Sequence, residues 1–298
     1  MQSSLFTEIR NFFSHGSVLA KLMGINLAFF ILVSLVRVMF FLADAPSAYD
    51  GIINWFGVPS DTGRLLARPW TAITYMFLHF DLLHIFFNML VLYIGGRIFK
   101  DFLGEERLAG TYIIGGLMGA LFFIVSYNIF PVFQDWVSMS VAVGASASVL
   151  AIFIAVATYM PNYQLPLIIL GPIRLKYIAI FFVVIDLISI DKANSGGHLA
   201  HLGGALWGFT YIALLKNGKD PGKWLSMWIK ALGSIFRKKP RMRVEYSSQR
   251  PVSDEEYNKR RADQQKRMDE ILDKISRHGY DSLSKEEKEI LFKLSNKK

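Results

Sequence analysis

Cysteine is absent from the 298 residues, and charged residues are scarce. Without cysteine the chain has no disulfide bonds and no thiol nucleophile. The absence of cysteine does not indicate in which cellular compartment the protein lies. Asp, Glu, Lys and Arg make up 19% of the chain, whereas 52% is hydrophobic; ordinary soluble domains hold about 25% charged residues. Several apolar runs reach the roughly 20 residues that cross a bilayer core. The composition therefore indicates a polytopic membrane protein.

The net charge comes from the C-terminal end of the chain. Residues 1–215 hold 11 Lys and Arg against 11 Asp and Glu, whereas residues 216–298 hold 22 against 13, which is the whole net charge of +9. A basic segment after the last span is typical of a cytoplasmic tail near anionic lipid. Its aromatic and basic residues are not interleaved as in nucleic-acid-binding modules, so no nucleic acid is expected as a partner.

Six apolar segments are expected to span the membrane, at 18–42, 74–99, 108–130, 142–160, 175–190 and 197–215. Six spans place both termini on one side, and most Lys and Arg of the short loops lie on that same side. The positive-inside rule then predicts that both termini are cytoplasmic. We expect three parts: a cytoplasmic N-terminal segment (1–17), a six-helix domain (18–215) and a basic cytoplasmic tail (216–298).

Amphipathic segments are expected outside the spans. The N-terminal segment has a short amphipathic pattern, and the loop 43–68 has enough apolar residues to lie in the membrane interface. In the tail, apolar residues between Trp224 and Phe236 form one helical stripe, typical of an interfacial helix.

A polar linker near 240–254 and a small helical hairpin are expected to follow. In the hairpin, Gly279 should end one helix, and Ser284 with Glu287 should cap the next.

Ser146 stands in Gly144-Ala145-Ser146, near the start of the fourth apolar run. The first N–H groups of a helix are unpaired and lie at the positive end of its dipole. They can stabilise an oxyanion on an acyl group that Ser146 attacks. Serine also packs membrane helices together. The position alone leaves both roles open and favours packing.

His201 lies inside the sixth apolar run, where ionisable side chains are costly and usually functional. It shares a helical stripe with Gly197, Gly204 and Gly208. Four small residues of the fourth run have the same spacing, namely Gly144, Ser148, Ala151 and Ala155. The two helices are therefore expected to pack closely through these stripes. His201 would then reach the serine of the fourth run. A structural histidine is the alternative.

His84 and Asn88 are four residues apart and lie on one face of the second span. Both side chains can donate hydrogen bonds, as an oxyanion pocket requires. His79, five residues before His84, is interpreted as structural. His198, one turn before His201, is expected at the outer surface.

These segments resemble the rhomboid family of intramembrane serine proteases. The resemblance consists of the stretch from His79 to Asn88 (HFDLLHIFFN), then Gly144-Ala145-Ser146, then Ala200-His201-Leu202-Gly203-Gly204 with Gly208. The motifs occur in the family's order and on the spans that the family uses.

The resemblance implies an all-α, six-transmembrane-helix bundle that cleaves transmembrane proteins from an active site open to the extracytoplasmic side. Ser146 would be the nucleophile and His201 the general base, a dyad with no third acidic member. Asn88, His84 and the Ser146 N–H would form the oxyanion hole. The residues expected to support the site structurally are His79, Gly144, Gly204 and Gly208. The resemblance implies no cofactor and no metal. It also implies a multi-pass protein of the bacterial inner membrane.

Two other functions are alternatives. A catalytically inactive rhomboid-like scaffold would usually have lost Ser146 or His201, and both are present. A metal-dependent protein would use the histidines at positions 79, 84, 198 and 201. The sequence has no His-Glu-x-x-His motif, and His79 and His84 are poorly phased for one metal ion.

Overall fold

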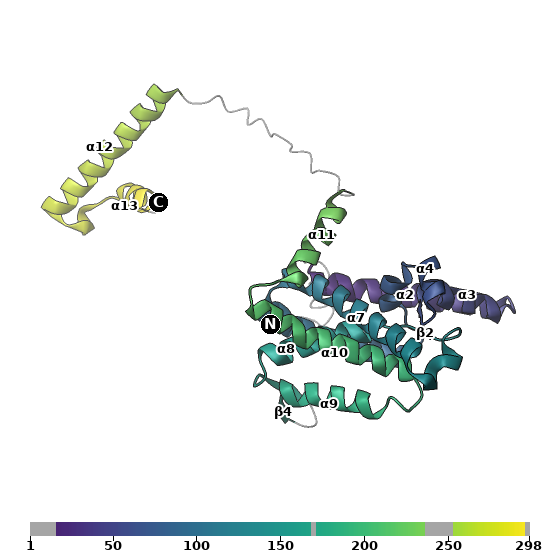
Figure 1. Cartoon of the computed structure of the whole chain (residues 1–298). Helices are drawn as coiled ribbons and strands as arrows, with labels where there is room; N and C mark the ends of the chain where they lie inside the picture. Colours follow the sequence, from purple (N-terminus) through teal and green to yellow (C-terminus); the bar gives the residue numbers. More distant parts are fainter. Residues whose placement is uncertain (1–15, 168–170, 236–252, 296–298) are drawn as a thin grey trace. The chain divides into compact units, whose positions relative to one another are not determined.

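The computed structural model describes residues 16–167, 171–235 and 253–295 (Figure 1). The expected amphipathic segment before residue 16 and the linker up to residue 252 lie outside the described residues. The chain divides into two compact units, Met1–Arg237 and Lys238–Lys298. The first unit extends beyond the expected boundary at residue 215, because a further helix packs against the bundle.

The principal helices of the first unit are α2 (Val18–Leu42), α6 (Leu82–Leu103), α7 (Leu108–Ile129), α8 (Ser146–Tyr159), α9 (Leu175–Ile188) and α10 (Ser195–Lys216). They match the six expected spans. The largest error is the start of the second span, expected at residue 74. Asp81 accepts a hydrogen bond from the Leu83 N–H (2.9 Å) and caps α6 there, so His79 lies in the preceding loop.

Three helices of the described residues are long and apolar enough to cross a membrane by length and composition: α2, α6 and α7, the last together with the preceding 3-10 turn η2 (Glu105–Arg107). Helices α8 and α9 have 14 residues each, about 21 Å at 1.5 Å per residue. Such helices are shorter than a bilayer core, so α8 begins or ends below a membrane surface.

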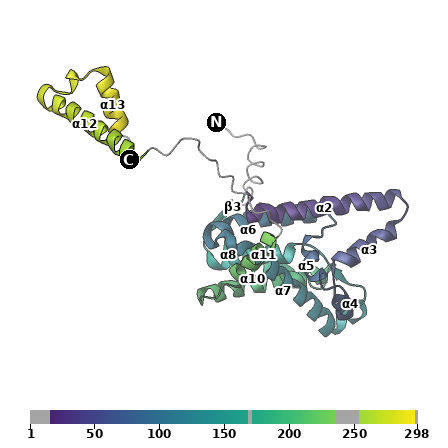
Figure 2. The ribbon, with the colours of Figure 1, turned by 90° about the horizontal axis from the view of Figure 1, so that it is seen from above.

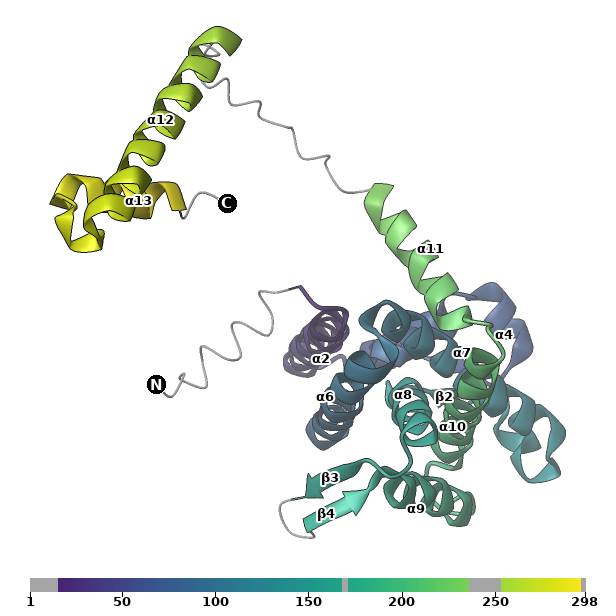
Figure 3. The same cartoon turned by 90° about the vertical axis from the view of Figure 1, so that its left-hand side faces the viewer.

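Helix α8 is the innermost helix of the bundle. Figure 3 shows it among α6, α7, α9 and α10, and all its residues from Ala147 to Ala157 are buried. Glycines permit the close packing: a Cβ on Gly204 of α10 would overlap the Ala147 carbonyl, and one on Gly208 would overlap that of Ala151. The predicted close contact is therefore present. Ser148, however, faces α7, where a Cβ on Gly116 would come within 2.5 Å of its Oγ.

The first loop, between α2 and α6, contains several short elements: α3 (Pro46–Phe56), β1 (Val58–Pro59), α4 (Thr62–Ala67), α5 (Thr71–Thr74) and the 3-10 turn η1 (Tyr75–Phe77). Trp55 and Trp70 stack at 5.5 Å between ring centroids. Strand β1 pairs with β2 (Val141–Ala142), with Val58 opposite Ala142. This pairing ties the first loop to the residues just before Ser146. The 3-10 helix η3 (Pro131–Trp136) lies between α7 and β2.

A β-hairpin, which the sequence reading did not predict, joins α8 to α9. Its strands β3 (Gln164–Leu167) and β4 (Gly171–Arg174) are antiparallel, with Gln164 opposite Arg174. Helix α9 follows directly and lies at the edge of the bundle (Figure 3). Its buried residues are Leu175 and Asp186.

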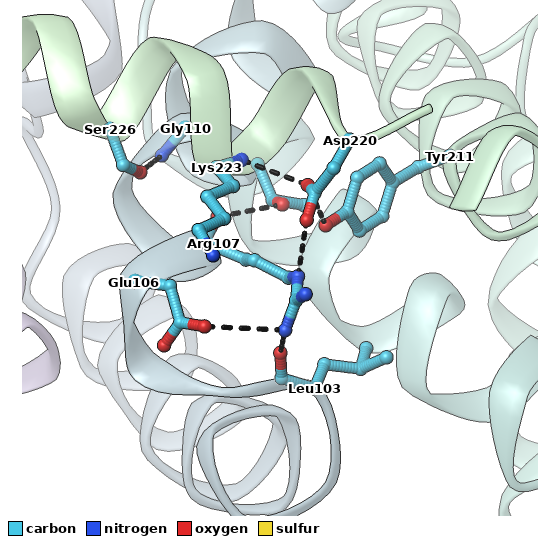
Figure 4. Close-up of polar contacts among 9 residues, drawn as sticks. Leu103, Glu106, Arg107, Gly110, Tyr211, Asp220, Lys223 and Ser226 are labelled. Atoms are coloured by element: carbon cyan, nitrogen blue, oxygen red, sulfur yellow. Dashed lines mark hydrogen bonds and ion pairs between the residues drawn. The ribbon is translucent and has the colours of Figure 1, made fainter. Parts of the chain in front are cut away.

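Helix α11 (Pro221–Ile235) is the additional helix of the first unit, and it packs against α7. Ser226 is buried and accepts a 2.8 Å hydrogen bond from the Gly110 N–H (Figure 4). Trp224 and Trp228 are exposed. The predicted amphipathic helix therefore packs through small residues and leaves both tryptophans on its open face.

An ionic cluster fixes the start of α11 to the bundle (Figure 4). The Asp220 carboxylate accepts hydrogen bonds from Arg107 Nε (2.5 Å), Tyr211 Oη (3.1 Å) and the Lys223 N–H (2.9 Å). Partial burial raises the pKa of Asp220, but these three donors outweigh it and hold the pKa below its usual value.

The second unit contains α12 (Asp254–His278), the 3-10 turn η4 (Tyr280–Ser282) and α13 (Lys285–Ser295), shown in Figure 2. The predicted ends are confirmed. Gly279 ends α12 with a φ of 76°. Glu287 accepts from the Ser284 N–H at 2.7 Å, while Ser284 Oγ accepts from the Glu287 N–H at 3.3 Å. Lys274 pairs with Glu287 at 2.9 Å and links the two helices.

Candidate active site

A short loop sets the position at which α8 begins. Gly144 has a φ of 118°, which favours glycine, and its N–H donates to the Tyr75 carbonyl at 2.9 Å. The next N–H, of Ala145, donates to His79 Nε2 at 3.3 Å, and His79 is fully buried. His79 and Gly144 thus lie beside the candidate site and hold the loop that precedes Ser146.

Ser146 is the first residue of α8, and its Oγ lies 2.6 Å from His201 Nε2. The two side chains come from α8 and α10 and are half-buried. Ser148 lies two residues later and is fully buried, and its Oγ has no hydrogen-bond partner among the described residues. Only Ser146 of these two serines is therefore placed to give its proton to an imidazole.

His84 and Asn88 lie on α6 near Ser146. A Cβ on Gly144 would come within 2.8 Å of His84 Cε1, so the His84 ring lies against this glycine. Asn88 Nδ2 donates to the His84 carbonyl at 3.0 Å, and an amide nitrogen has a second N–H to offer. His84 and Asn88 both line a cavity with Ser146 and His201. The predicted oxyanion donors are thus gathered on one side of the serine.

Ser146 lines two cavities. The first has a volume of about 650 Å³ and extends past Tyr75 and His84 to Asn194, just before α10. The second, of about 280 Å³, lies between α6, α8, α9 and α10 and includes Leu150 and Phe182. The serine is therefore reachable both from the end of the bundle and from between its helices.

Asp186 is a neighbour of His201 that the sequence reading missed. Its Oδ1 lies 2.8 Å from His201 Nδ1 and 2.8 Å from His198 Nδ1, and the residue is 5% exposed. The resemblance implied no acidic third member, whereas the structure puts a carboxylate from α9 on the far side of the imidazole. Its signal in the sequence was a lone acid in the fifth apolar run.

Asp186, His198 and His201 are also the one group among the described residues that could hold a metal ion, because their ligand atoms lie within 4.8 Å of one another. This group excludes His79 and His84, which the metal-dependent alternative required. The 2.8 Å separations are hydrogen-bond distances. A carboxylate that orients a histidine explains the arrangement directly.

Comparison with known proteins gives two family matches. Residues 66–218, just over half of the chain, match the Rhomboid domain. Residues 253–297 match a family of unknown function, DUF6576, and this match covers α12 and α13.

Relatives include the mitochondrial RHOMBOID-like protein 12 of Arabidopsis thaliana, 29% identical over 161 residues (51% of this chain, 48% of the relative). The mitochondrial presenilin-associated rhomboid-like protein of Rattus norvegicus is 28% identical over 196 residues (61% and 48%). Rhomboid protease GlpG of Pectobacterium atrosepticum is 29% identical over 114 residues (32% and 40%).

The chain spans about half the length of the first two relatives. The match over residues 66–218 includes α6 to α10 and every residue of the candidate site. With its apolar helical bundle, the chain belongs to the rhomboid family of multi-pass membrane proteins.

Proposed function

We propose that this protein is an intramembrane serine endopeptidase, with Ser146 as nucleophile and His201 as general base. The observation that supports this most directly is the 2.6 Å contact between Ser146 Oγ and His201 Nε2 at the N-terminal end of α8. A serine hydroxyl is a weak nucleophile unless an adjacent base removes its proton. The base here comes from a different helix and points at the hydroxyl.

The reaction needs an oxyanion stabiliser, and three donors surround the serine. The Ser146 N–H is among the unpaired groups at the start of α8. His84 and Asn88 supply side-chain donors from α6 on the same cavity. Donors fixed before the reaction stabilise the developing charge without reorganisation. The larger cavity gives water a route to hydrolyse the acyl-enzyme.

The proposed substrates are transmembrane proteins whose helices reach Ser146 between the helices of the bundle. The proposed location is the bacterial inner membrane, in keeping with the similarity to Rhomboid protease GlpG of Pectobacterium atrosepticum. The distribution of Lys and Arg supports cytoplasmic positions for both termini. Anionic lipid is the proposed partner of the basic tail. The exposed Trp224 and Trp228 of α11 suit a membrane interface, where aromatic rings gather.

The test is labelling of the detergent-purified protein with a fluorophosphonate, together with cleavage of a model transmembrane substrate. The wild type should be labelled and active, and Ser146→Ala should be neither. Ser148→Ala is the matched control because it removes the same hydroxyl two residues away and should retain labelling. Labelling that survives Ser146→Ala but not Ser148→Ala would refute the nucleophile assignment.

The same assay separates the two alternatives. An inactive scaffold would show no labelling in the folded wild type. A metal-dependent enzyme using Asp186, His198 and His201 would lose cleavage on treatment with a chelator and regain it with added metal. The serine mechanism predicts equal cleavage with and without chelator.

A further inference from the structure

Asp186 is an unusual residue for its helix. Its two neighbours on helix α9, Ile185 and Leu187, are exposed apolar side chains, whereas Asp186 is buried. A carboxylate at membrane depth is costly and is retained where it meets a partner. The Asp186 carboxylate is buried toward α10, which carries its two histidine partners, His198 and His201. A buried carboxylate at this position therefore indicates a function that depends on its charge or its hydrogen bonds.

The hydrogen bonds form a continuous chain from α9 to the serine. Asp186 Oδ1 is 2.8 Å from His201 Nδ1, and His201 Nε2 is 2.6 Å from Ser146 Oγ. The two imidazole nitrogens are thus used by two different partners on opposite edges of the ring.

We propose that Asp186 is the positioning residue of His201 and completes a Ser-His-Asp arrangement in this protein. This inference rests on the proposed protease function. An ionised carboxylate only accepts hydrogen bonds, so the proton of neutral His201 must lie on Nδ1. That tautomer leaves the lone pair on Nε2, which faces Ser146. Without the carboxylate, the opposite tautomer would leave Nε2 protonated and unable to act as base.

Ser146 Oγ bonds to the substrate carbonyl carbon while its proton moves to His201 Nε2. The imidazolium formed keeps its Nδ1 proton hydrogen-bonded to Asp186, which stays ionised and stabilises the positive charge. The Nε2 proton then passes to the leaving amine as the peptide C–N bond breaks. Water then bonds to the acyl carbon and gives one proton to Nε2. The acyl C–Oγ bond breaks, that proton passes to Oγ, and the product leaves as a carboxylic acid.

His198 explains how Asp186 is held in place. Its Nδ1 lies 2.8 Å from the same Oδ1, and it precedes His201 by about one helical turn on α10. Two donors from one helix fix the direction of the carboxylate, so it cannot rotate freely toward solvent. Asp186 therefore orients His201, while His198 orients Asp186.

The test uses the full-length protein in detergent with the model substrate, and Asp186→Asn as the principal variant. Asparagine has the same shape, and its oxygen can still accept hydrogen bonds, so packing is retained. In serine proteases with a triad, this change lowers kcat by about 10⁴-fold by favouring the wrong tautomer. Here we expect kcat to fall by at least about 10²-fold, with KM and the melting temperature little changed.

Asp191→Asn is the matched control. It removes the same charge five residues later, from a side chain that is 76% exposed, and should keep wild-type kcat. A double variant tests whether Asp186 acts through His201. In the His201→Ala background, adding Asp186→Asn should change the residual fluorophosphonate labelling rate by less than about twofold, because groups that act as a unit are not additive.

Three results would overturn the inference: a kcat for Asp186→Asn within about threefold of wild type, a loss matched by Asp191→Asn, or an additive loss in the double variant. If Asp186→Asn does not fold, Asp186→Glu replaces it. The longer side chain displaces the carboxylate, so kcat should fall in a folded protein, and wild-type kcat would refute the role. An unlabelled, inactive wild type would instead refute the proposed function itself.

Discussion

Replacing Gly204 with alanine should separate α8 from α10 near Ser146 and His201. An added Cβ would overlap the Ala147 carbonyl and lie within 3.0 Å of Ala147 C and Cα. These are backbone atoms, so no side chain can rotate away. Ala147 directly follows Ser146, and Gly204 lies one turn after His201. The helices must therefore move apart where the serine and the histidine meet.

The size of the effect follows from two opposed terms. Overpacking of a close-packed interior costs about 1–3 kcal/mol, and alanine regains about 1 kcal/mol of helix propensity over glycine. Gly204→Ala should therefore destabilise the protein by about 0–2 kcal/mol. The effect on activity should be larger, because a misplacement of about 1 Å can lower the rate by about 10²-fold. The contact at risk is the 2.6 Å pair of Ser146 and His201.

Gly95→Ala is the control. Gly95 is also a helical glycine of the bundle, but its added Cβ would lie at an ordinary 3.4 Å from Phe153 Cδ2. It shares the propensity gain, so the difference between the two variants isolates the packing cost, about 1–3 kcal/mol. Thermal unfolding in detergent and cleavage of the model substrate measure both effects. Equal melting temperatures and equal kcat in the two variants would refute the close-packing argument.

Asn88→Ala should lower kcat by about 10²- to 10³-fold with little loss of stability, because it removes a hydrogen-bond donor used mainly in the transition state. Unchanged turnover in this variant, in His84→Ala and in their double variant would contradict the oxyanion role. A second expectation concerns pH. The pKa of Asp220 is lowered in the folded protein, so its contribution to stability is present above the unfolded pKa and is lost as pH falls through the folded pKa. Melting temperatures measured from neutral to acid pH should therefore fall more steeply for wild type than for Asp220→Asn, and parallel curves would argue against the Arg107–Asp220 pair.

Local sequence signals gave the helices and their ends. Capping and glycine rules operate within four residues, and the predicted capping box at Ser284 and helix end at Gly279 are both present. Apolar runs gave the spans, with an error where α6 begins at Leu82 after its cap at Asp81. The hairpin between α8 and α9 was missed because Gln164–Arg174 was treated only as a loop.

At the candidate site, the sequence did not determine the rotation of each helix about its own axis. The small-residue stripe correctly predicted that α8 and α10 pack closely, but it placed Ser148 on the face toward α10. Ser148 faces α7 instead. Asp186 was missed for a similar reason. A lone acid in an apolar run indicates that the carboxylate has a polar partner, but the sequence does not identify His201, 15 residues away, as that partner. Only the packing of α9 against α10 brings them together.

The depth of Ser146 predicts where substrates are cut. On the proposed topology α7 ends at the outer side, and 14-residue α8 begins at Ser146, so the serine lies below the outer surface. A substrate helix bonds its own backbone and offers no free carbonyl until it unwinds, which glycine or proline makes easier by about 1–3 kcal/mol. We expect cuts in or beside the outer third of single-span helices, next to small or helix-breaking residues. Mass spectrometry of the products locates the cut, and cuts gathered at the cytoplasmic end would reject both the depth and the topology.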